Sequence, residues 1–118
     1  MTGITQATPA AVRDGLASGE VLLVDVREAN EYAVERIPGA LLYPLSTFDP
    51  KAIPAGGRRV VLQCGGGGRS MRAAQALVAA GHTQVENLDG GIRAWKAQGL
   101  PLIRIDPASG QVVEHGRC

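Results

Sequence analysis

The sequence has few aromatic residues and almost no net charge. Only four of its 118 residues are aromatic, and its 12 basic and 11 acidic side chains leave a formal net charge of +1. A base-stacking surface needs several aromatic rings, and attraction to a phosphate backbone needs a concentrated positive field. The composition therefore predicts that neither nucleic acid nor an acidic membrane surface is a partner of this protein.

Long apolar runs are also missing. No stretch approaches the ~18 consecutive apolar residues that are typical of a membrane-spanning helix. The first residues lack the basic and apolar regions of a signal peptide. We therefore expect a cytoplasmic protein that has no membrane partner.

Cysteine and histidine are scarce as well. The two cysteines, Cys64 and Cys118, are far apart, and the two histidines are His82 and His115. These residues have neither the pattern of a disulfide framework nor the spacing of a metal cluster. The sequence therefore predicts no metal and no cofactor. We expect Cys118 to be a solvent-exposed thiol.

The most informative stretch is the segment from Cys64 to Ser70, here called the cysteine loop, which contains four consecutive glycines. It follows the apolar run 60–62 and precedes a helical pattern at 71–80, so Cys64 is expected where a strand ends and a helix is about to begin. The unpaired N–H groups and the dipole of a helix N-terminus favour negative charge, and they lower the pKa of a cysteine that faces them.

The glycines indicate an anion-binding loop. Because glycine has no Cβ, successive backbone N–H groups can turn toward one point and bind an anion there, in this case over the sulfur of Cys64. Arg69 would supply a fixed positive charge at the far end, although it could equally be a solvated residue that pairs with a carboxylate. The simpler interpretation of the whole stretch is a flexible connection that carries an ordinary buried cysteine.

Strands and helices alternate along the rest of the chain. Thr8 and Pro9 are typical of a helix start, and Gly19 is typical of a helix end. The continuous apolar runs at 21–26 and 60–63 are typical of strands that are covered on both faces of a parallel sheet. The other expected elements are a short edge strand at 4–5, a helix from Asn30 to Arg36, extended segments at 40–43 and 85–88, and helices at 70–80 and 92–98.

This alternation predicts an α/β domain, a three-layer sandwich with a mainly parallel sheet between helices. Ligands of such folds bind at the carboxyl ends of the strands, where the cysteine loop lies. Asp25 and Arg27 also end a strand, and we expect them to support the site by hydrogen bonds that tie neighbouring loops together. Trp95 is expected in the core. Residues 106–118 are expected to form a loosely ordered tail.

Five segments, taken in order, resemble the rhodanese-like sulfurtransferase family over about residues 4–103. They are Leu-Val-Asp-Val-Arg-Glu at 23–28, Glu-Tyr at 31–32, Ile-Pro-Gly-Ala at 37–40, the cysteine loop, and Leu-Asp-Gly-Gly-Ile-Arg-Ala-Trp at 88–95. Five ordered matches at the right separations are far more specific than any one of them. The resemblance implies a five-stranded parallel sheet and assigns residues 1–105 to a rhodanese-like domain.

The resemblance also implies roles for residues of the cysteine loop. Cys64 would carry sulfur as a persulfide, and loop N–H groups would hold the donor's anion and the persulfide. That binding role falls on Gly65, Gly66, Gly67, Gly68, Arg69 and Ser70. The chain departs from the family in its run of glycines, which leaves a more open pocket, and in Arg36, which stands where histidine is frequent.

The reaction expected from this resemblance is a two-step transfer. The Cys64 thiolate takes the outer sulfur of a donor such as thiosulfate and releases sulfite, and cyanide or a thiol then removes that sulfur. The expected partners are thus a small-molecule sulfur donor and a thiol or cyanide acceptor. A persulfide-carrying protein is a further candidate partner, and Cys118 is a further candidate acceptor.

Two other functions remain open on the same residues. A cysteine-dependent phosphatase or arsenate reductase would use the same thiolate and anion-binding loop. Phosphatases of this kind place five residues between cysteine and arginine, whereas this chain has four between Cys64 and Arg69. The other alternative is a non-catalytic sulfur carrier or binding module with the rhodanese fold. Such modules usually lack the cysteine.

Overall fold

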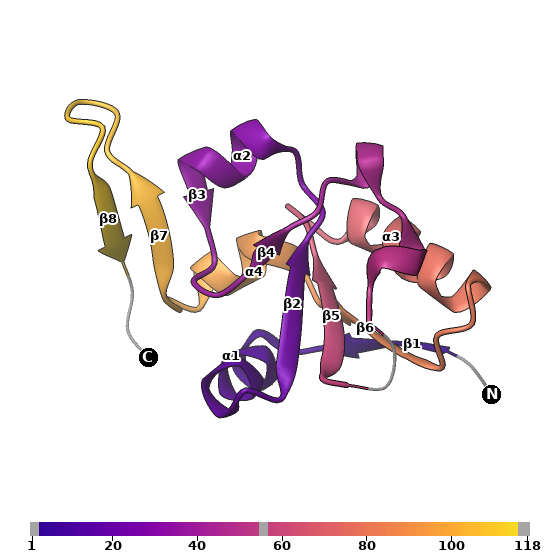
Figure 1. Cartoon of the computed structure of the whole chain (residues 1–118). Helices are drawn as coiled ribbons and strands as arrows, with labels where there is room; N and C mark the ends of the chain where they lie inside the picture. The colour runs from indigo at the N-terminus through magenta and orange to yellow at the C-terminus, as the bar shows by residue number, and fades with distance from the viewer. Residues whose placement is uncertain (1–2, 55–56, 116–118) are drawn as a thin grey trace.

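The structure is a computed structural model that describes residues 3–54 and 57–115. Its centre is a five-stranded parallel sheet with the strand order β1-β6-β5-β2-β4 (Figure 1). The strands are β1 (Gly3–Ala7), β2 (Val21–Asp25), β4 (Leu41–Leu42), β5 (Arg59–Gln63) and β6 (Gln84–Leu88). The predicted parallel sheet is confirmed, and β5, which leads to Cys64, is its central strand.

Helices cover both faces of this sheet, as predicted. On one face α1 (Pro9–Ser18) and α4 (Gly91–Ala97) bury apolar side chains that include Val12, Ile92 and Trp95. On the other face α3 (Gly68–Ala79) buries Ala73, Ala74 and Leu77. Two short 3-10 turns, at 45–47 and 50–52, lie in the connection between β4 and β5. Within the described part of the chain, none of the helices has the length and the apolar run that a membrane crossing needs.

The first helix begins and ends at the residues that the sequence indicated. The Thr8 hydroxyl accepts a hydrogen bond from the Ala11 N–H at 3.2 Å, and Pro9 is the first helical residue. Gly19 ends the helix in the left-handed conformation, with φ of 82°. Local capping chemistry is therefore sufficient to set both ends of α1.

The second helix differs from its prediction at both ends. Instead of a helix that Asn30 caps and that runs through Arg36, α2 spans Ala29–Val34, and Glu28 is its N-cap. Glu28 and Glu31 form a reciprocal capping box, in which the Glu28 N–H donates to Glu31 Oε1 at 3.0 Å. The chain leaves the helix early because β3 (Glu35–Arg36) pairs with a later strand.

A second, antiparallel sheet with the order β3-β7-β8 was not predicted. Its hairpin of β7 (Leu102–Ile105) and β8 (Val112–His115) projects from the main body (Figure 1). The expectation of a loose tail from residue 106 is therefore wrong for residues 112–115. The turn explains the difference, because the Asp106 carboxylate accepts hydrogen bonds from Ala108 N at 3.0 Å and from Ser109 Oγ at 2.8 Å. Cys118 lies outside the described residues.

Candidate active site

Cys64 lies between the end of β5 and the start of α3, the strand–loop–helix arrangement that the sequence indicated. Its side chain is 2% exposed and packs with the apolar residues beneath α3. The apolar contacts surround only part of the sulfur, since polar groups of the cysteine loop approach it from the helix side. The thiol is therefore buried but not chemically isolated.

Two hydrogen bonds reach the sulfur directly. The Gly67 N–H donates to Cys64 Sγ at 3.0 Å, and Ser70 Oγ lies 3.4 Å from the same atom. Gly67 has φ of 116°, a conformation that a residue with a Cβ rarely adopts. Burial alone would raise the pKa of the Cys64 thiol, but hydrogen bonds from the Ser70 hydroxyl and from the backbone of Ser70, Gly67 and Arg69 outweigh it and lower the pKa.

The start of α4 fixes the orientation of the loop's peptide groups. Ile92 N donates to the Cys64 carbonyl at 2.9 Å, and Arg93 N donates to the Gly65 carbonyl at 3.2 Å. A Cβ at Gly91 would lie 2.4 Å from the Cys64 carbonyl oxygen, so only glycine allows α4 to come this close. Because a trans peptide places its N–H opposite its carbonyl, the N–H groups of Gly65 and Gly66 point away from α4.

Ser70 belongs to a chain of polar side chains that runs from the core to the surface and was not recognised from the sequence. Ser70 and Asn87 are 0% and 3% exposed, and the Ser70 hydroxyl lies within hydrogen-bond distance of Asn87 Oδ1 and of the Gly67 carbonyl, which compete with the sulfur for its single proton. Asn87 Nδ2 in turn donates to Gln6 Oε1 at 2.8 Å. The hydroxyl beside the sulfur is thus positioned by side chains from β6 and β1.

Arg69 pairs with Glu31, a residue that the sequence did not connect with the loop. The two guanidinium nitrogens Nη1 and Nη2 contact the two carboxylate oxygens at 2.6 and 3.0 Å. The Arg69 hydrogen bonds lower the pKa of Glu31 from its ordinary 4.5 to about 2. Glu31 therefore stays ionised at ordinary pH and neutralises Arg69, which is the alternative role considered for this arginine.

Arg93 is a second cation at the loop, and it was not singled out from the sequence. A Cβ built at Gly66 would lie 3.3 Å from Arg93 Nη1 and 3.8 Å from its Cζ. The guanidinium group thus lies beside the backbone of Gly66. A Cβ built at Gly65 would lie 3.4 Å from Arg69 Nη2, whereas a Cβ built at Gly68 would meet no atom within 4 Å.

Asp25 and Arg27 form a buried ion pair beside the site, with Arg27 Nη2 2.7 Å from Asp25 Oδ2. Arg27 Nη2 also donates to the Glu35 carbonyl at 2.7 Å. The pair therefore ties the end of β2 to β3, while its supporting role toward the cysteine loop stays a prediction. In the described part of the chain it makes no hydrogen bond to residues 64–70.

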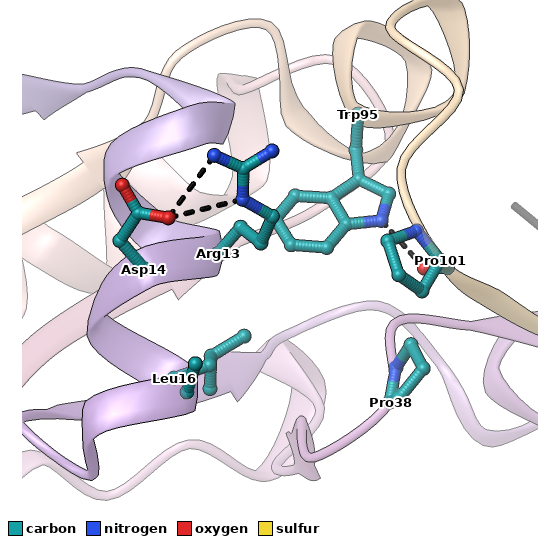
Figure 2. A pocket seen from close by; sticks show the side chains of 7 residues that line it. Arg13, Asp14, Leu16, Pro38, Trp95 and Pro101 are labelled. Atoms are coloured by element: carbon teal, nitrogen blue, oxygen red, sulfur yellow. Dashed lines mark hydrogen bonds and ion pairs between the residues drawn. The ribbon is translucent and has the colours of Figure 1, made fainter. Parts of the chain in front are cut away.

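One cavity lies away from the cysteine loop. It has a volume of about 580 Å³ and opens between α1, Pro38 and Pro101 (Figure 2). Trp95 borders this cavity and donates a hydrogen bond from Nε1 to the Pro101 carbonyl at 2.7 Å. Because Trp95 is only 2% exposed, its predicted place in the core is confirmed. Among the described residues, no group of three or more His, Cys, Asp or Glu side chains lies close enough together to hold a metal ion.

Comparison with known proteins gives a consistent picture. The profile of the rhodanese-like domain matches residues 8–98. The uncharacterized protein slr1261 of Synechocystis is 44% identical over 85 residues, which are 71% of this chain but 48% of that protein. A sulfurtransferase of Allochromatium vinosum is 42% identical over 86 residues, covering 71% of this chain and 79% of that one.

A solved structure shares the fold along almost its whole length. The human single-domain sulfurtransferase TSTD1 superposes with a TM-score of 0.71 at 30% identity, over 81% of this chain and 98% of that chain. The profile match, the two relatives and this structure all describe the same domain, although the chain spans only about half the length of the Synechocystis protein. The chain belongs to the rhodanese-like domain family.

Proposed function

We propose that this protein is a sulfurtransferase that carries a sulfane sulfur as a persulfide on Cys64. The observation that supports this most directly is the environment of the sulfur, with the Gly67 N–H at 3.0 Å and the Ser70 hydroxyl at 3.4 Å. These donors favour the thiolate, which is the nucleophilic form of cysteine. Membership of the rhodanese-like family and the names of the similar sulfurtransferases agree with this chemistry.

The first step loads the enzyme. The Cys64 thiolate attacks the outer sulfur of thiosulfate, a new S–S bond forms, and the bond between the two thiosulfate sulfurs breaks. The bonding pair leaves with sulfite, so a thiolate and thiosulfate become a Cys64 persulfide anion and sulfite with no change in total charge. The loop N–H groups would hold the terminal sulfur of the persulfide.

The second step removes the sulfur. Cyanide attacks the outer sulfur of the persulfide, the S–S bond breaks, and thiocyanate leaves while the Cys64 thiolate is restored. A thiol acceptor would take the sulfur in the same way. No general base is needed, because the thiolate is already ionised and every leaving group departs as an anion. A modest lowering of the pKa suits both steps, since a very acidic thiol is a poor nucleophile.

The experiment is an intact-mass measurement on a Cys118→Ser variant, in which Cys64 is the single cysteine. Incubation with thiosulfate should make this variant one sulfur atom heavier, and cyanide should remove that sulfur as thiocyanate. The matched control is Cys64→Ala with Cys118 intact, which should gain no stable sulfur. If the single-cysteine variant never gains sulfur from thiosulfate or from an organic persulfide, the proposal is wrong.

The same samples separate the alternatives. A cysteine-dependent phosphatase would release phosphate from an aryl phosphate, and this release would disappear in Cys64→Ala. A binding module would show neither activity while still folding. Cys118 would be established as an acceptor if removal of this residue slowed turnover with a thiol, whereas unchanged turnover would exclude it.

A further inference from the structure

The two arginines at the cysteine loop differ in how their charge is used. Arg69 is held by both oxygens of Glu31, at 2.6 and 3.0 Å. Because the pKa of Glu31 is lowered to about 2, this neutralisation persists through the whole working range of pH. Arg69 therefore offers little net positive charge to an incoming anion.

Arg93 differs from Arg69 in that no acidic side chain of the described residues neutralises its charge. Among residues 3–54 and 57–115, no carboxylate lies close enough to it to form an ion pair. The side chain is exposed, and the backbone from which it extends is held at the loop because the Arg93 N–H donates to the Gly65 carbonyl at 3.2 Å. Its guanidinium group lies beside Gly66.

The absence of a side chain at Gly66 keeps this cation accessible. A Cβ at this position would come within 3.3 Å of Arg93 Nη1, which is tighter than an ordinary van der Waals contact. A side chain at this position would therefore press on the guanidinium and make it shift. The open loop thus leaves a planar, two-pronged hydrogen-bond donor beside the backbone that follows Cys64, and this geometry matches an oxyanion with two adjacent oxygens.

We propose that Arg93 is the anion-binding residue of this site and that it selects sulfur donors in which an oxyanionic group is bonded directly to the transferred sulfur. Thiosulfate and organic thiosulfonates belong to this class. A persulfide of a thiol such as glutathione does not, because its carboxylates lie several bonds away from the reacting sulfur. The choice of donor class rests on the proposed sulfurtransferase function, whereas binding of the anion itself does not.

The first measurement is anion binding without transfer. Iodoacetamide is neutral, so it reports the reactivity of Cys64 in the single-cysteine Cys118→Ser background without needing Arg93. Sulfate cannot donate a sulfane sulfur, and at constant ionic strength it should slow alkylation by occupying the site. Arg93→Gln should abolish this protection, which is measured as the ratio of the alkylation rates with and without sulfate so that any change in the reactivity of Cys64 itself cancels.

The second measurement is the rate of persulfide formation. Arg93→Gln should lower kcat/KM for thiosulfate roughly tenfold, the loss expected for one charge-assisted hydrogen bond at an exposed site. The rate with glutathione persulfide should stay close to that of the parent. The matched control is Arg58→Gln, which removes the same charge from an exposed residue at the opposite end of β5 and should change neither rate.

The outcomes distinguish the two proposals. If sulfate protects Arg93→Gln as well as it protects the parent, or if thiosulfate and glutathione persulfide lose rate equally, the role of Arg93 is refuted while the Cys64 persulfide stands. If no donor loads Cys64 but sulfate protection still depends on Arg93, the anion site is real and the sulfurtransferase proposal fails.

Discussion

Replacing Ser70 by alanine should raise the pKa of the Cys64 thiol. The substitution removes a fully buried hydroxyl whose oxygen lies 3.4 Å from the sulfur, and it leaves the Gly67 N–H in place. A hydrogen bond to a charged group contributes about 1.5–3 kcal/mol, and one pKa unit corresponds to about 1.4 kcal/mol. Since the contact is long and the Ser70 proton is shared with the Gly67 carbonyl and Asn87, we expect the lower end, about one unit.

The effect on reactivity should change sign with pH. Near neutral pH a rise of about one unit reduces the thiolate fraction up to roughly tenfold, but the more basic thiolate is intrinsically about threefold more reactive. Alkylation by iodoacetamide should therefore be roughly three- to fourfold slower at neutral pH. At a pH above both pKa values every thiol is ionised, and the variant should react about threefold faster than the parent.

The assay is the rate of alkylation against pH in the Cys118→Ser background, with thiolate absorbance as an independent titration. Ser18→Ala, which alters an exposed serine on α1, is the control and should reproduce the parent curve. Damage to the fold would lower or raise the rate at every pH, so the crossing of the two curves is specific to the hydrogen bond. A midpoint that does not move would refute the role assigned to Ser70.

Two further substitutions test how the site is supported. Gly91→Ala would place a Cβ 2.4 Å from the Cys64 carbonyl oxygen at φ of 61°, and it should lower the free energy of unfolding by at least ~2 kcal/mol, whereas Gly3→Ala should not. Arg27→Met would leave the Asp25 carboxylate buried without its partner and should cost about 3–5 kcal/mol. Urea denaturation measures both, and an unchanged midpoint in either variant contradicts the contact concerned.

The main sheet and the first helix could be predicted because their signals are local. Thr8 and Gly19 cap α1 by contacts within a few residues, and the apolar runs of β2 and β5 identify buried parallel strands. The second sheet gave no such signal. Its strand at 35–36 is too short to show alternation, and residues 112–115 become a strand only because the turn at Asp106 folds them back onto β7.

The contacts within the cysteine loop could be partly predicted from the sequence, because some of them are also local. Cys64 and Ser70 are close in sequence, so a strand–loop–helix arrangement is enough to bring the hydroxyl near the sulfur. Glu31 lies 38 residues from Arg69, and nothing local indicates which carboxylate this arginine would meet. The position of Arg93 likewise depends on how α4 docks against the loop, which is a tertiary contact.

Ile92 N and Arg93 N donate hydrogen bonds to the Cys64 and Gly65 carbonyls. The position of α4 therefore constrains the size of the backbone ring that the cysteine loop forms around the sulfur. An extra residue inserted directly after Cys64, which would give the phosphatase spacing, would move the Gly65 carbonyl away from the Arg93 N–H that it accepts from. Enlarging the ring for a bulkier oxyanion would thus require redesign of 90–93 together with the insertion. The size of reagent that this protein accepts is therefore set partly by the backbone of α4, through its hydrogen bonds to the loop.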